Sequence, residues 1–359
     1  MAKPPFRAEH IGSLLRPPGL LDMRRRHMAG EMGDDELREA EDDAINSAIA
    51  LQERVGMKIV TDGEFRRSAY HDYFFERLGD VAIGYPPVNA EDAKNGAKRA
   101  TQPMAIVKSR LQWTAPIHAA EVEFLKQRSD AIPKITLPGP CTLHFRGGTP
   151  EILRHGAYSG IGEFWSDVVE AYASEFAALD GAGCTYIQID ETAFAKFSDP
   201  KVQSTLAERG DDWQALIDDY IEVTNRVLAR APASLNIGMH LCRGNRSGHF
   251  HAEGGYDMVA EKMFNALDFD FYFLEYDSPR AGNFAPLRFL PSGKAAVLGL
   301  ISTKSGEMAA PDDLKRRIDE AGRYTDLGQL GLSPQCGFAS IASGNPITAA
   351  IQEGKLRLV

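Results

Sequence analysis

The chain has 359 residues, of which 43% are hydrophobic and 25% are charged, and this balance predicts a soluble, globular protein with a large core. Its formal net charge of -10 at pH 7 argues against a nucleic-acid surface, because phosphate binding needs clustered Lys and Arg. No apolar run reaches the length of a membrane span and the first residues lack the apolar core of a secretion signal, so we expect a cytoplasmic protein that binds neither nucleic acid nor membrane.

The first predicted element is a short extended segment, 7–17, which contains a turn at Gly12 and Ser13. Backbone amides at such a turn can hold a carboxylate, which makes the turn a candidate anchor for an amino acid. These residues taken alone more often form an ordinary turn, and both interpretations stay open.

An amphipathic helix is predicted over 34–55. Apolar side chains recur there at the spacing of one helical face. Asp34 or Asp35 can serve as the N-cap, and Gly56 supplies the stop.

A pattern of short apolar runs that end in polar residues begins after this helix and continues along the chain. The run 57–60 leads into Glu64, and helical stretches separate the later runs. The other predicted strands are 133–137, 185–189, 234–239, 269–274, 295–301 and 330–335, and the predicted helices include 161–180, 211–230 and 311–322. Strands that alternate with helices predict an α/β protein with a parallel sheet, and about eight such units suit a (β/α)8 TIM barrel.

A TIM barrel is preferred over a doubly wound open sheet because of where the reactive side chains fall. They occur at the C-terminal ends of at least five predicted strands, spread along the whole chain. A barrel gathers all of these ends into one mouth, whereas an open sheet concentrates them near a switch point. The sequence has no low-complexity linker and no internal repeat, so we expect residues 1–359 to form a single TIM-barrel domain, with 244–256 as a loop over its mouth.

The most informative pair of residues is His240 and Cys242. Side chains of a strand alternate between its faces, so these two point the same way and can bind one ion. If the strand ends converge, Glu275 and Cys336 add one oxygen and one sulfur, and the four residues close a tetrahedron around Zn²⁺. A lone His or Cys at a strand end is usually structural, but the set with its His-x-Cys pair favours a metal. Four cysteines in so long a chain are too few for a disulfide framework.

At these residues the sequence resembles the catalytic domain of cobalamin-independent methionine synthase, and the resemblance covers nearly the whole chain. In the family's order the shared motifs are Ile11-Gly12-Ser13, Asp62-Gly63-Glu64, Gln188-Ile189-Asp190-Glu191, His240-Leu241-Cys242, Glu275 and Gln335-Cys336-Gly337. The last three of these motifs are specific, whereas the first two are weak by themselves.

The resemblance implies a zinc-dependent transfer of a methyl group to homocysteine, which gives methionine. In the family, one His, two Cys and one Glu hold the zinc. The corresponding residues here are His240, Cys242, Cys336 and Glu275. Coordination to zinc turns a thiol into a thiolate at neutral pH, which is the nucleophile that the reaction needs. Glu275 is the hardest of the four ligands, and we expect it to yield when the substrate sulfur binds.

The resemblance also implies how homocysteine is held. The residues that correspond to the family's substrate contacts are Ile11, Ser13, Glu64 and Asp190. Glu64 and Asp190 can pair with the substrate ammonium, and the backbone at Ser13 can bind its carboxylate.

The methyl-donor side departs from the family's pattern. Lys304 stands where the long synthases carry a His proposed to protonate the departing folate, so we expect Lys304 to act in catalysis with Glu64 and Asp190. The stretch 139–146 has no Trp where the family stacks the pterin. The donor is therefore 5-methyltetrahydrofolate held differently, a methylated corrinoid or another methylated compound, and the chain resembles a short, single-barrel relative of the long synthases.

Two alternative functions remain compatible with the residues. Epoxyalkane:coenzyme M transferases look similar and use a zinc-bound thiolate to open an epoxide, but their thiol carries a sulfonate, which Glu64 and Asp190 do not favour. A zinc-stabilised binding barrel without turnover is the alternative from another class. A structural zinc does not require charged groups such as Lys304 at strand ends, although ion-pair roles would also account for them.

Overall fold

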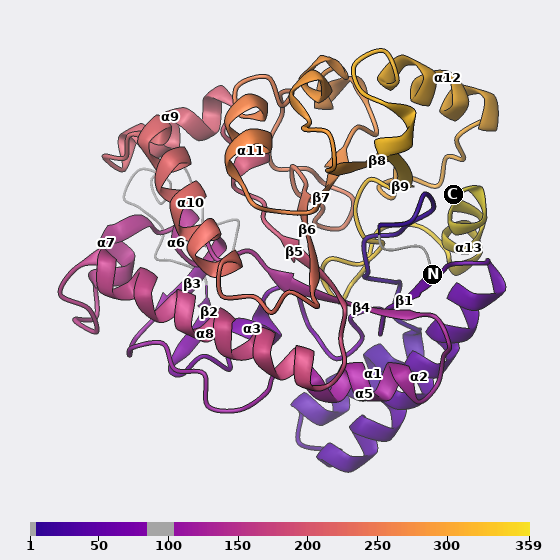
Figure 1. Ribbon diagram of the computed structural model, residues 1–359. Helices are drawn as coiled ribbons and strands as arrows, with labels where there is room; N and C mark the ends of the chain where they lie inside the picture. Colours follow the sequence, from indigo (N-terminus) through magenta and orange to yellow (C-terminus); the bar gives the residue numbers. More distant parts are fainter. Residues whose placement is uncertain (1–4, 85–103) are drawn as a thin grey trace, which may run out of the picture.

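A parallel sheet forms the centre of the computed structural model, which describes residues 5–84 and 104–359 (Figure 1). Within these residues the main sheet has seven strands in the order β1-β4-β5-β6-β7-β8-β9, and each neighbouring pair is parallel. The strands are β1 (Ile59–Val60), β4 (Ile132–Pro138), β5 (Tyr186–Asp190), β6 (Asn236–Leu241), β7 (Phe271–Glu275), β8 (Ala295–Ile301) and β9 (Leu330–Pro334). The sheet curls, and the helices lie around its outside (Figure 1).

The N-terminal segment supplies the eighth extended piece of the expected TIM barrel. Ala8 forms a parallel bridge with Leu332 of β9, and Glu9 N donates to Leu332 O at 3.0 Å. On the other side, Thr61 Oγ1 after β1 donates to Gly12 O at 2.8 Å. The fold is therefore the predicted barrel, with a first strand reduced to one bridge because the chain leaves the extended conformation at Gly12, whose φ is +135°.

The long predicted helices are confirmed within one or two residues at each end. They are α2 (Asp34–Arg54), α8 (Ile161–Gly181), α10 (Trp213–Leu228) and α12 (Pro311–Ala321). The predicted N-cap of α2 is wrong, because Gly33 occupies that position and its N–H donates to Glu36 Oε2 at 3.3 Å. Asp34 and Asp35 lie instead in the first turn, where the helix dipole favours carboxylates.

Further short elements surround this frame. The hairpin of β2 (Val81–Gly84) and β3 (Met104–Val107) is antiparallel and lies outside the main sheet. The remaining helices are α1 (Pro18–Met28), α3 (Asp72–Phe75), α5 (Ala119–Lys126), α6 (Thr142–Phe145), α7 (Gly148–Leu153), α9 (Pro200–Glu208), α11 (Ala260–Ala266) and α13 (Ala349–Leu358), with 3-10 turns η1 (Phe194–Lys196), η2 (Pro279–Ala281), η3 (Ala285–Phe289) and η4 (Leu327–Gln329). None of the described helices is long and apolar enough to cross a membrane.

The interior of the barrel contains an apolar layer and a buried ion pair. The apolar layer is Ile11, Ile59, Tyr186, Phe271, Phe273 and Val297. Lys134 of β4 is buried beside Glu9, with Nζ 3.5 Å from Glu9 Oε2 and 3.1 Å from Gln188 Oε1, and it also donates to His10 O. Removing one partner of a buried pair costs about 3 to 5 kcal/mol, so Lys134 fastens the N-terminal segment to β4 and β5. This contact positions the turn at Ser13.

Candidate metal and thiol site

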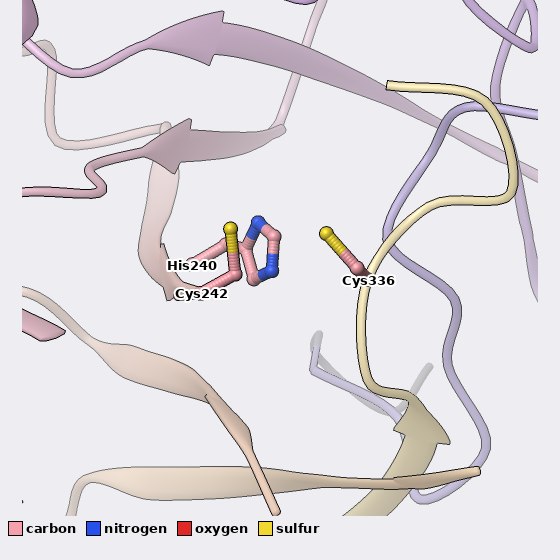
Figure 2. A group of neighbouring side chains, drawn as sticks. All are labelled: His240, Cys242 and Cys336. Atoms are coloured by element: carbon pink, nitrogen blue, oxygen red, sulfur yellow. The ribbon is translucent and has the colours of Figure 1, made fainter. Parts of the chain in front are cut away.

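His240, Cys242 and Cys336 come together at the C-terminal end of the sheet. One ligand atom from each residue lies within 4.8 Å of the other two, and all three side chains are buried. Figure 2 shows Cys336, from the loop after β9, pointing toward the two side chains at the end of β6. The barrel thus brings together residues almost 100 positions apart, as the sequence predicted for these three.

The His240 ring has one nitrogen engaged and one without a partner. Nδ1 lies 2.9 Å from Oδ1 of Asp190, its register partner on β5. Burial opposes protonation of the imidazole, but the Asp190 carboxylate outweighs this and raises the pKa of His240. Nε2 is buried and has no hydrogen-bond partner among the described residues. A proton held on Nδ1 by a carboxylate leaves the Nε2 lone pair for a metal ion.

The pKa values of the two neighbouring cysteines shift in opposite directions. A hydrogen bond from the Cys336 thiol lowers the pKa of Cys242 to about 6, although burial opposes ionisation. The pKa of Cys336 is correspondingly raised well above its usual range. One imidazole nitrogen and two sulfurs at mutual distances under 4.8 Å form a donor set that suits zinc.

Glu275 lies near this group but is not part of it in the described residues. Arg243 N donates to Glu275 Oε2 at 2.5 Å, and Arg280 Nη2 and Lys304 Nζ donate to Oε1, the latter at 3.0 Å. Burial raises the pKa of Glu275, but Lys304 and Arg280 overcome this and hold it at about 2. The carboxylate is anionic, but it must loosen these contacts to reach an ion, so its role as fourth ligand stays a prediction.

Lys304 lies behind Glu275 and does not line the cavity beside the metal residues. Its Nζ is 3.0 Å from Glu275 Oε1 and 3.1 Å from Asp277 Oδ2. These two carboxylates raise the pKa of Lys304 against the effect of burial. In this geometry Lys304 is a counter-ion of the Glu275 carboxylate, and its predicted part in catalysis has no support from its placement.

The predicted substrate residues border one cavity of about 320 Å³ together with the three metal residues. The four are Ile11, Ser13, Glu64 and Asp190. The predicted loop 244–256 also borders this cavity through Gly244, Asn245, Arg246 and His251. The side chains that the sequence placed at separate strand ends therefore face a common space.

Glu64 is held in a strained conformation with one oxygen unused. Its φ is +60°, uncommon for a residue other than glycine, and Asp62 Oδ1 accepts from its N–H at 2.8 Å. Thr136 Oγ1 donates to Oε1 at 2.9 Å, whereas Oε2 is buried without a partner among the described residues. Burial raises the pKa of Glu64 to about 7; Arg67 opposes the shift and Asp190 adds to it. Such a carboxyl is suited to a ligand cation.

The turn at Ser13 packs directly against the loop that carries Cys336. Phe338 N donates to Ser13 O at 2.9 Å, and Ala339 N donates to Ser13 Oγ at 3.3 Å. A Cβ atom at Gly337 would lie 1.9 Å from Ser13 Oγ. The glycine of the Gln-Cys-Gly motif is therefore required by the close approach of the turn at Ser13 to the loop that carries Cys336.

Sequence reasoning missed two features of the cavity. Asp190 orients His240 in addition to facing the cavity, a role that depends on the β5–β6 register. The cavity wall also includes Arg146 and Lys196, which follow β4 and β5. Their position after predicted strands indicates that they lie near the mouth, but it does not distinguish them from other residues there, such as Lys304.

The comparisons with known proteins agree on one family. Residues 6–352 match the family model described as cobalamin-independent synthase, catalytic domain. A Bacillus subtilis protein, YxjH, described as uncharacterized, is 40% identical over 359 residues, which cover 99% of this chain and 93% of YxjH. A methionine synthase of Thermococcus kodakarensis is 24% identical over 91% of this chain and 85% of its own length.

Solved structures show the same fold. A vitamin-B12 independent methionine synthase candidate from Listeria monocytogenes aligns with a TM-score of 0.75 and 31% identity, over 98% of this chain and 95% of its own. A B12-independent methionine synthase from Shewanella sp. W3-18-1, solved in complex with selenomethionine, aligns with a TM-score of 0.73 and 18% identity over the same shares. The second likeness concerns the fold alone.

Proposed function

Because this chain belongs to the cobalamin-independent methionine synthase family, we propose that it is a zinc-dependent methyltransferase that converts homocysteine to methionine. One observation carries the proposal: two buried atoms without partners, His240 Nε2 and Glu64 Oε2, belong to residues that border the same cavity. The first suits a metal ion and the second suits an ammonium group. A thiol amino acid can bind the metal ion through its sulfur and Glu64 through its ammonium group.

The proposed zinc ligands are His240 through Nε2, Cys242 and Cys336, with Glu275 as the fourth. Bound zinc lowers the pKa of a coordinated thiol, so that the substrate is a thiolate at neutral pH. Asp190 fixes the His240 tautomer, and Arg280 and Lys304 hydrogen-bond the Glu275 carboxylate, which would compete with its binding to zinc. Glu275 is therefore the ligand that we expect to give way to the substrate sulfur, because Arg280 and Lys304 can hold its carboxylate.

The proposed homocysteine contacts are Ile11, Ser13, Glu64 and Asp190. Glu64 gives its unused oxygen to the ammonium group, which favours the ionised carboxylate. Asp190 lies on the same wall and adds negative charge, and the turn at Ser13 receives the carboxylate. These contacts position the sulfur, and positioning supplies much of the rate of a two-substrate reaction.

The methyl donor in this proposal is 5-methyltetrahydrofolate or another methylated compound, such as a methylated corrinoid. The thiolate sulfur forms a bond to the methyl carbon while the bond from that carbon to the donor atom breaks. The electron pair of the broken bond stays on the donor atom. No oxidant or reductant is required.

A matrix of acceptors and donors tests the proposal. Zinc-loaded protein is incubated with homocysteine or coenzyme M, each against 5-methyltetrahydrofolate, methylcobalamin and a short epoxide. We expect methionine from homocysteine with at least one methyl donor. Alkylation of coenzyme M alone would support the epoxide-opening alternative, and product from no pair would contradict the proposed activity with these donors.

A further inference from the structure

One side of the cavity carries a group of cations that the proposed function does not use. We name the cationic wall after its three residues, Arg146, Lys196 and Arg246, which border the cavity together with Cys242. Arg146 follows α6, Lys196 ends η1, and Arg246 lies in the 244–256 loop. Loops that follow three neighbouring strands, β4, β5 and β6, therefore converge their positive charges at one place.

Lys196 is buried without a carboxylate partner in the described part of the chain. It is only 5% exposed, Nζ donates to Thr192 Oγ1 at 3.1 Å, and the Phe145 ring lies 5.5 Å away. Of the other two buried lysines in the described residues, Lys134 pairs with Glu9 and Lys355 donates to the backbone oxygens of Ser302 and Glu307. A buried ammonium is costly unless it is paired, and it has three hydrogens to donate. Burial and the charge of Arg146 lower the pKa of Lys196 to about 8.

Different charged neighbours act on the pKa of Lys196 and on that of Glu64. Besides burial, the charges that act on the pKa of Lys196 are those of Arg146, Cys242 and Glu191. Among those that act on Glu64 is the carboxylate of Asp190, and Lys196 is not one of the principal influences there. The cavity thus carries both the acidic side chains of Glu64 and Asp190 and the cationic wall.

We propose that the cationic wall binds an anionic group on the methyl donor, so that the donor is a small organic acid, a carboxylate or a sulfonate, with a transferable methyl group. This inference rests on the proposed function of the same site. The cavity volume of about 320 Å³ must also hold the thiol, and it lies at the low end of the roughly 300 to 1,000 Å³ common for ligand pockets. A small donor fits this space best.

The cationic wall has a consequence for the transfer step itself. The sulfur–carbon bond forms, the bond from the methyl carbon to the donor atom breaks, and the electron pair remains on the donor atom. The donor therefore becomes more negative as it loses its methyl group. Fixed positive charges beside it stabilise that charge more strongly in the transition state than in the ground state.

Binding of probe anions to the zinc-loaded protein tests the inference without turnover. Propionate, ethanesulfonate and the neutral isostere propionamide are titrated by ligand-observed NMR, with homocysteine absent and then saturating. We expect both anions to bind alongside homocysteine and propionamide to bind at least about tenfold more weakly, since hydrogen bonds to charged groups are the stronger ones. Anions that displace homocysteine, or that bind no better than the amide, would overturn the proposal.

Variants at Lys196 assign the effect to this residue. Lys196→Gln should weaken anion binding at least about tenfold, whereas Lys196→Arg should retain most of it. The matched control is Lys201→Gln, on the exposed face of α9, which should bind the anions like the wild type. Equal loss in all three variants, or no loss in Lys196→Gln, would refute the assignment. Homocysteine binding is measured separately on the same samples, so failure of the proposed function is distinguished from failure of this inference.

Discussion

Replacing Asp190 with Asn is expected to weaken zinc binding while leaving the barrel intact. Oδ1 of Asp190 accepts from both His240 Nδ1 at 2.9 Å and Gln188 Nε2 at 2.7 Å. An Asn side chain can keep its carbonyl oxygen in this position, so the variant removes the charge and preserves the His240 tautomer. Mutations of such supporting groups cost about 10- to 100-fold in metal affinity, and we expect Asp190→Asn at the lower end.

Asp190→Ala removes the acceptor as well as the charge. The His240 ring then loses its orientation, and the expected loss lies near the upper end, about 100-fold or roughly 2.8 kcal/mol. Competition with a chromophoric zinc chelator at neutral pH measures both affinities. The matched control is Asp218→Asn, an exposed residue paired with Lys262, which should bind zinc like the wild type. Wild-type affinity in both Asp190 variants would refute the role of this residue in holding His240.

Three further predictions follow from the same site. Cys242→Ser and Cys336→Ser should each lose most of the bound zinc, measured by elemental analysis of protein with wild-type circular dichroism; full occupancy in both would remove the site. The pKa of Glu64 is raised to about 7 in the folded protein, so its contribution to stability is complete below the unfolded value near 4.5 and is lost as the pH rises through 7. Ligand-free wild type should therefore lose stability relative to Glu64→Gln across this window, by at most about 1.4 kcal/mol per pH unit in urea titrations, and parallel curves would contradict the shift. Gly337→Ala should lower activity more than tenfold, because the added Cβ would lie 1.9 Å from Ser13 Oγ. The control is Gly306→Ala, whose Cβ would lie 3.1 Å from the end of the Ile351 side chain and which should be nearly neutral. Equal activity of the two variants would contradict the tight fit at Gly337.

The barrel was predictable because strands of a parallel sheet are buried on both faces and read as short apolar runs. Residues 295–301 and 269–274 are clear examples, since each ends in charged or polar residues at the mouth. The antiparallel pairing of β2 and β3 was not predicted, because its two short strands are far apart in the sequence. The single bridge at Ala8 depends on its contact with Leu332, which no local pattern reveals.

The candidate metal residues were predictable because the His-x-Cys pair fixes two ligands on one strand face. Which lysine borders the cavity was not predictable, because Lys304 and Lys196 both follow strands and only the packing of their loops distinguishes them. The second role of Asp190 also escaped, since it depends on register between neighbouring strands. Local pattern predicts which residues reach the mouth, and tertiary contacts decide which neighbour each one meets.

The contact between Ser13 and Phe338 links the metal loop to the closure of the barrel. Cys336 lies two residues before Phe338, whose N–H donates to Ser13 O at 2.9 Å, and Ala8 bridges β9 a few residues earlier. If a metal ion binds at the proposed site, it would tie Cys336 to the end of β6 and would also restrain the seam where the first and last strands of the barrel meet. We therefore expect metal binding to increase the protection of the N-terminal segment against amide exchange.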